Sequence, residues 1–79
     1  GDQNIYILGK ELLDKFKTRK LSAIQLFNEH QALSKYCRTH YSDTLRDLVE
    51  QGKVKATFTD NKEHSVAVLI NEHCILEFN

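Results

Sequence analysis

Cysteine and histidine are the residue types in this sequence that could bind a metal ion. Cys37 and His40 stand three residues apart in the stretch Cys-Arg-Thr-His. The further candidate zinc ligands are His30, His64, His73 and Cys74. A closed zinc site usually draws its four ligands from two tight pairs, and the neighbours His73 and Cys74 would point to opposite faces of a strand. The sequence therefore predicts no metal site and no cofactor, with Cys37 packed in the core as a small apolar side chain.

The same cysteine and histidine could also act as a nucleophile and its base. Such a pair needs a pocket and a group of donors that stabilise an oxyanion. The chain has only three glycines, with no glycine-rich loop and no paired carboxylate motif that would cradle phosphate or move protons. The sequence therefore predicts that the protein is not an enzyme.

Charge is unevenly distributed along a chain whose formal net charge is zero. Residues 10–20 carry five lysine or arginine side chains against Glu11 and Asp14, whereas residues 63–79 carry three glutamates and no lysine or arginine. A neutral total of this kind can conceal a basic face and an acidic face. The choice of partner therefore depends on where the fold brings the basic residues together.

Length and hydropathy restrict the organisation of the chain. Its 79 residues suffice for a single domain over residues 1–79. The longest apolar run, residues 66–70, is far shorter than the roughly 20 residues of a membrane span. We therefore expect an intracellular domain without membrane contact. Because the sequence starts without methionine and stops after a strand-like segment, we also expect a piece of a longer protein.

Apolar spacing predicts helices in the first two thirds of the chain. Residues 4–8 read as a short strand or apolar lead-in, and a helix over residues 10–19 follows Gly9. Ser22 and Gln25 form a capping box at the start of a second helix, which should end near residue 31. Ser34 is the expected cap of a third helix.

The spacing changes from helical to strand-like at Gly52, which is expected to end the third helix. Residues 54–59 alternate apolar and polar side chains, residues 60–64 have turn composition, and further strands are predicted at residues 65–70 and 74–78. The predicted fold is α+β, with three helices followed by an antiparallel β-meander. Residues 4–8 could add a short N-terminal strand to that sheet.

This order of elements resembles the winged helix-turn-helix family. The likeness is carried by Leu-Ser-Ala-Ile at residues 21–24 and by Leu-Arg-Asp-Leu-Val-Glu-Gln-Gly-Lys-Val at residues 45–54. The resemblance implies that the third helix, about residues 34–51, enters the major groove of double-stranded DNA while a β-hairpin wing lies beside it. It also implies a role within a transcription regulator or a DNA-processing protein.

Three groups of DNA-contacting residues follow from the resemblance. On the third helix they are Lys35, Arg38, Thr39, Ser42, Asp43 and Arg46, which would face base edges. The first helix would contribute phosphate contacts from Lys15, Lys17 and Arg19, and the wing would contribute Asn61 and Lys62. Asp43 fits least well, because it repels phosphate and could only accept a hydrogen bond from a cytosine amine.

A winged-helix domain used for dimerisation or for docking another protein is the alternative. The zero net charge and the acidic last third favour it, and an exposed edge strand over residues 74–78 could pair with a strand of the partner. Convergence of the basic residues on one face would indicate nucleic acid, and scatter would indicate protein.

Overall fold

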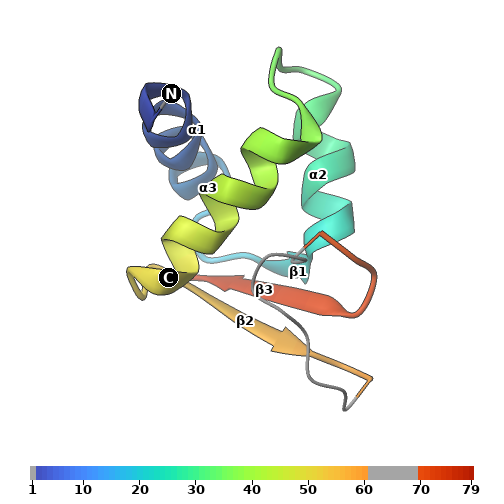
Figure 1. The fold of residues 1–79 in the computed structure, drawn as a ribbon. Helices are drawn as coiled ribbons and strands as arrows, with labels where there is room; N and C mark the ends of the chain where they lie inside the picture. The colour runs from blue at the N-terminus through green and yellow to red at the C-terminus, as the bar shows by residue number, and fades with distance from the viewer. Residues whose placement is uncertain (1, 61–69) are drawn as a thin grey trace.

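The domain consists of three helices packed on one side of a small sheet (Figure 1). The structure, a computed structural model, describes residues 2–60 and 70–79. The elements run in the order α1 (Asp2–Lys15), β1 (Lys20–Ser22), α2 (Ala23–Gln31), α3 (Arg38–Glu50), β2 (Val54–Phe58) and β3 (Cys74–Phe78). The predicted α+β class with three helices is therefore confirmed.

The sheet has the order β1-β3-β2, and both pairings are antiparallel. Leu76 lies between Leu21 of β1 and Ala56 of β2, so these side chains share the face that meets the helices. The alternation predicted for the last strand is confirmed, because Cys74, Leu76 and Phe78 are all buried. The outer face of the sheet carries charged and hydroxyl side chains around the half-buried Ile75.

Two expectations about the sheet are wrong. β2 pairs directly with β3, so no further strand lies between them; the strand predicted at residues 65–70 falls, except for Ile70, outside the described residues. β3 also has a partner along each of its edges and is not the open edge strand expected for docking. The three-residue β1 was missed, since so short a segment shows no periodicity.

The N-terminal segment is helical, so the prediction of a short strand at residues 4–8 is wrong. α1 already begins at Asp2 and continues through Gly9 to Lys15. Gly9 lies where α1 crosses α3: a Cβ placed on it would be 3.6 Å from Thr44 Cγ2 and 3.7 Å from Leu48 Cδ2. Packing against α3 thus outweighs the low helix propensity of glycine.

Gly9→Ala should stabilise the domain by about 0.5–1 kcal/mol, because alanine is the better helix former and its methyl group would meet α3 at ordinary van der Waals distance. Urea denaturation of the two proteins measures the difference. Gly52→Ala is the matched control with the opposite sign: Gly52 has a φ of 74°, and alanine there should cost about 1 kcal/mol. Destabilisation by Gly9→Ala would show that the crossing of α1 and α3 has no room for a methyl group.

α2 begins as the sequence predicts. The Ser22 hydroxyl accepts a hydrogen bond from the Gln25 backbone N–H at 3.1 Å, and the helix ends at Gln31. The reciprocal half of the expected capping box is not seen, because the Gln25 side chain donates to Glu29 at 2.8 Å. The N-terminus of α2 therefore depends on Ser22.

α3 begins four residues later than expected, at Arg38 instead of Ser34. Ser34 does not cap it, since its hydroxyl lies 2.6 Å from the Tyr41 hydroxyl. The N-cap is Cys37, which is exposed and not packed in the core; its Sγ atom lies 3.4 Å from His40 Nδ1. Glu50 ends the helix just before Gly52, as predicted.

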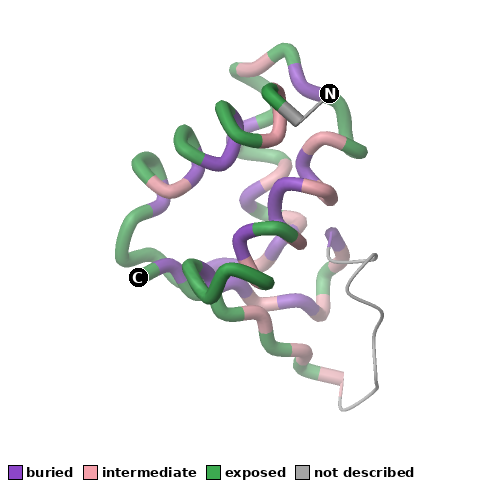
Figure 2. The backbone as a smooth tube through the Cα atoms, turned by 60° about the vertical axis from the view of Figure 1, so that its left-hand side comes forward, coloured by how far each residue is buried: buried purple, intermediate pink, exposed green. Residues whose placement is uncertain are grey.

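The core lies between the helices and the inner face of the sheet. Figure 2 shows buried residues along the sides of the helices that face one another and exposed residues along their outer sides. Tyr41 is fully buried, and the Phe27 ring meets its ring edge-on at a centroid distance of 5.2 Å. Tyr6 of α1, in contrast, is 63% exposed.

Candidate nucleic-acid interface

α3 has one buried face and one open face. Tyr41, Thr44, Leu45 and Leu48 pack into the core. The other side carries four of the predicted DNA-contacting residues within two turns: Thr39, Ser42, Asp43 and Arg46. Thr39 is exposed, and the other three are partly exposed. The structure therefore brings these four side chains together on one surface.

A buried hydrogen-bond network fixes α3 against α2. His30 of α2 is 7% exposed, and its Nδ1 atom lies 2.7 Å from the Tyr41 hydroxyl of α3. The same hydroxyl meets Ser34 in the loop between the two helices. Nothing in the sequence signals the network, because its members are spread over three segments.

Burial determines the protonation of this network. Desolvation lowers the pKa of His30, although Glu11 of α1, 3.9 Å away, opposes part of that shift. Burial also raises the pKa of Tyr41. Both groups are therefore neutral at neutral pH. A neutral imidazole with its proton on Nε2, towards Glu11, accepts a hydrogen bond from the Tyr41 hydroxyl at Nδ1.

Arg38 is turned away from the open face of α3. Its Nη2 atom donates a hydrogen bond to the Ile70 carbonyl at 2.8 Å, and its guanidinium lies 5.4 Å from the centroid of the Phe27 ring. One side chain thus links α3 to α2 and to the segment that leads into β3. These contacts give Arg38 a structural role, although the residue is exposed.

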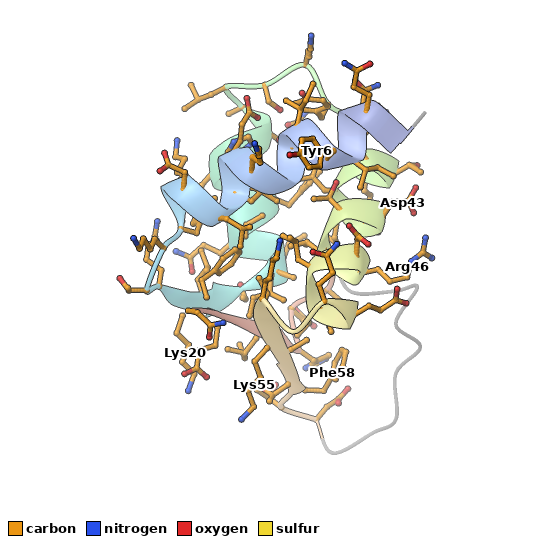
Figure 3. The ribbon with its side chains drawn as sticks, turned by 90° about the vertical axis from the view of Figure 1, so that its left-hand side faces the viewer. Tyr6, Lys20, Asp43, Arg46, Lys55 and Phe58 are labelled. Carbon is orange, nitrogen blue, oxygen red and sulfur yellow. The ribbon has the colours of Figure 1, made fainter. Side chains whose placement is uncertain are left out.

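The open face of α3 changes in charge along its length. Its first turn has no acidic residue. Farther along, Arg46 is paired with Asp43 at 3.2 Å, and Asp47 and Glu50 follow without a cationic partner among the described residues. Figure 3 shows Asp43 and Arg46 together on α3, far from Lys20 and Lys55 on the sheet. The part of α3 that precedes Asp47 is therefore electrostatically better suited to approach DNA than its last turn.

The basic residues of α1 do not join this face. The turn after α1 leads into β1 beneath the helices, at the opposite end from the first turn of α3 (Figure 1). Arg19 is held there by Glu29 at 3.3 Å and lies over the Phe16 ring. Lys15 and Lys17 are exposed in the same region. Asn61 and Lys62 lie outside the described residues.

Three further lysines, which the sequence did not single out, extend this basic region. Lys20 and Lys55 stand on either side of Glu77 on the outer face of the sheet. Lys53 follows α3 and lines one hollow together with Lys10 and Lys17. The pairing of Lys20 with Glu77 could not be predicted, because β1 was not predicted from the sequence.

Comparison with known families agrees with this architecture. A family model described as the GMT-like wHTH domain matches residues 1–61, where wHTH stands for winged helix-turn-helix. The chain belongs to the GMT-like wHTH family. No curated protein and no solved structure gave a match. Membership in this winged helix-turn-helix family supports DNA binding as the general function of the domain.

Two other properties concern the described residues alone. Residues 2–60 and 70–79 contain no cluster of three or more histidine, cysteine, aspartate or glutamate side chains placed to hold a metal ion. None of the helices within those ranges is long and apolar enough to cross a membrane.

Proposed function

We propose that this domain binds double-stranded DNA by placing α3, from its N-terminus to Arg46, in the major groove. The observation that carries the proposal is the open face of α3, where Thr39, Ser42 and Arg46 lie together while the opposite side of the helix is packed in the core. A major groove is wide enough to admit a helix, and the first turns of a recognition helix reach the base edges. The role is binding, with no catalytic step.

Electrostatics determine which end of α3 approaches the DNA. The N-terminus of a helix carries a partial positive charge, and Lys35 in the preceding loop is exposed. Asp47 and Glu50 stand in the last turns and would repel phosphate. We therefore infer that α3 enters the groove by its N-terminal end and not along its whole length.

The proposed contacts differ in what each side chain supplies. Thr39 and Ser42 can donate to or accept from base edges, and Lys35 can reach phosphate. Arg46 can donate to the two acceptors of guanine, but it must first leave Asp43, which lies 3.2 Å away. The Asp43 carboxylate thus opposes binding in two ways, by holding Arg46 and by repelling phosphate.

The test is fluorescence anisotropy of a labelled mixed-sequence duplex, titrated with this domain at low salt and at about 0.15 M salt. Arg46→Ala should weaken binding about 5- to 150-fold, the range given by a base contact worth about 1–3 kcal/mol. Lys35→Ala should weaken binding to all sequences and reduce the salt slope by about one unit. Asp43→Asn should tighten binding, since it frees Arg46.

Lys20→Ala is the matched control, because Lys20 is exposed on the sheet and not on α3. It should leave the affinity for the duplex nearly unchanged. Circular dichroism verifies that each variant is folded. If Lys20→Ala weakens binding while Arg46→Ala and Lys35→Ala do not, DNA contacts the sheet and the proposed orientation is wrong.

We place the domain in a transcription regulator or a DNA-processing protein, because a binding unit of this size would direct another activity to DNA. Arg38 would serve this function indirectly. By holding the Ile70 carbonyl, it fixes the segment that leads into β3 relative to the first turn of α3.

A further inference from the structure

A continuous furrow runs between α1 and α3. It consists of three adjoining hollows: the first two share Ile5, Tyr6 and Asp47, and the last two share Lys10, Leu13 and Lys53. One end lies beside the N-terminal half of α1. The other end lies beside the residues that follow α1 and α3.

The two ends of the furrow carry opposite charge. Asp43, Asp47, Glu50 and Arg46 line one end, giving a formal side-chain charge of −2. Lysines 10, 17 and 53 line the other end together with Asp14, giving +2. Glu50 and Lys17 are exposed, and neither has an ion-pair partner among the residues that the structure describes.

The middle of the furrow is apolar and bordered by an exposed aromatic ring. Ile5 and Leu13 are half-buried there, and Tyr6 stands 63% exposed at the border. The Lys10 ammonium lies 4.9 Å from the centroid of the Tyr6 ring. Figure 3 shows Tyr6 on the outward side of α1. An exposed tyrosine beside an apolar hollow is typical of an anchor in a protein interface.

We propose that the furrow is an interface between two copies of this chain, related by a two-fold axis near Tyr6. In such an interface the same patch serves both partners, so each residue that contacts a second one is contacted by it in return. Rotation by half a turn brings the −2 end of one furrow onto the +2 end of the other. The acidic end of each copy then meets the basic end of the other, so the surface is electrostatically complementary to a second copy of itself.

The shape also suits a second copy. α1 forms a ridge beside the furrow, with Tyr6 projecting from it. In the proposed dimer, α1 of each copy packs against the furrow of the other. The result is a four-helix contact made of α1 and α3 from both chains. This inference does not rest on the proposed DNA binding. Asp43 and Arg46 line the acidic end of the furrow, so the dimer covers two of the residues proposed to face DNA, and dimerisation and that contact compete.

A charge-exchange experiment on this domain tests the interface. Sedimentation equilibrium at low salt should show a reversible dimer in the unmodified chain. Glu50→Lys and Lys17→Glu should each raise the dimer dissociation constant at least about tenfold, because each places like charges opposite one another and a tenfold change corresponds to about 1.4 kcal/mol. The double variant Glu50→Lys with Lys17→Glu should restore dimerisation, since both ends again meet opposite charge.

Two further variants complete the test. Tyr6→Ala should also weaken the dimer, whereas Asn28→Glu, which adds a negative charge to the exposed surface of α2, should not. Circular dichroism confirms that each variant retains its helices. A chain that stays monomeric at every concentration, single exchanges that have no effect, or a double exchange that fails to restore the dimer would each overturn the proposal.

Discussion

Phe16→Ala should remove about 3–5 kcal/mol from the free energy of unfolding, the usual cost of deleting a buried phenylalanine ring. Phe16 is fully buried at the end of α1. Its ring centroid lies 5.8 Å from that of Phe78 on β3 and 6.3 Å from that of His30 on α2. One side chain thus joins the first helix, the second helix and the central strand.

The expected loss is a large part of the total, because small domains are stable by only about 5–15 kcal/mol. Urea denaturation followed by circular dichroism measures it. Phe16→Leu keeps much of the buried volume and should cost less than about 1.5 kcal/mol. Equal costs for the two variants would mean that the ring contacts with Phe78 and His30 contribute little.

Tyr41→Phe is expected to cost about 1–3 kcal/mol, the penalty for leaving a buried polar partner unpaired. The variant keeps the ring and removes only the hydroxyl that contacts His30 Nδ1 at 2.7 Å and Ser34 Oγ at 2.6 Å. Tyr36→Phe is the matched control: Tyr36 is also buried, but its hydroxyl has no hydrogen-bond partner among the described residues. A similar cost for both variants would contradict the role of the network.

The same network makes stability depend on pH. Burial holds the pKa of His30 below its ordinary value of about 6.5, so the unfolded chain binds a proton more readily than the folded one. The contribution of neutral His30 is complete above that value. It is lost progressively as the pH falls from about 6.5 towards the pKa of the folded state. Denaturation at several pH values should show this loss, and His30→Gln should reduce it.

Several elements could be predicted because their signals are local. The Ser22 cap, the stop at Gly52 and the alternation in β2 and β3 each depend on residues a few positions apart. The winged helix-turn-helix family was recognised from such short patterns. Local chemistry therefore predicted the class of fold, the bounds of α2 and β3, and the start of β2.

The remaining features depend on contacts between distant segments. From the sequence alone Gly9 predicts the end of an element, and only its packing against α3 explains why the helix continues through it. Residues Lys20–Ser22 form β1 because they pair with β3. Ser34 has the composition of a helix cap, but its hydroxyl bonds to Tyr41 seven residues later. The secondary-structure propensity of a residue cannot show that a contact with a distant segment will override its local preference.

The candidate site was predictable in part for the same reason. Helical spacing alone places Thr39, Ser42, Asp43 and Arg46 on one face, and the structure shows them there. The hydrogen bond from Arg38 to Ile70 spans 32 positions in the sequence. The ion pair of Arg19 with Glu29 likewise depends on how the α1–β1 turn meets α2. Whether a cation is available to DNA could therefore be judged only from the fold.

The position of β3 in the middle of the sheet affects how the chain folds as it is synthesised. Among the described residues, β1 and β2 each pair with β3 alone, which follows them by more than a dozen residues. A ribosome that has made residues 1–60 has produced all three helices, but both other strands still lack their partner. Sheet formation must wait for residues 74–78, and closing such long loops slows folding. Until then the apolar faces of β1 and β2 are open to chaperones.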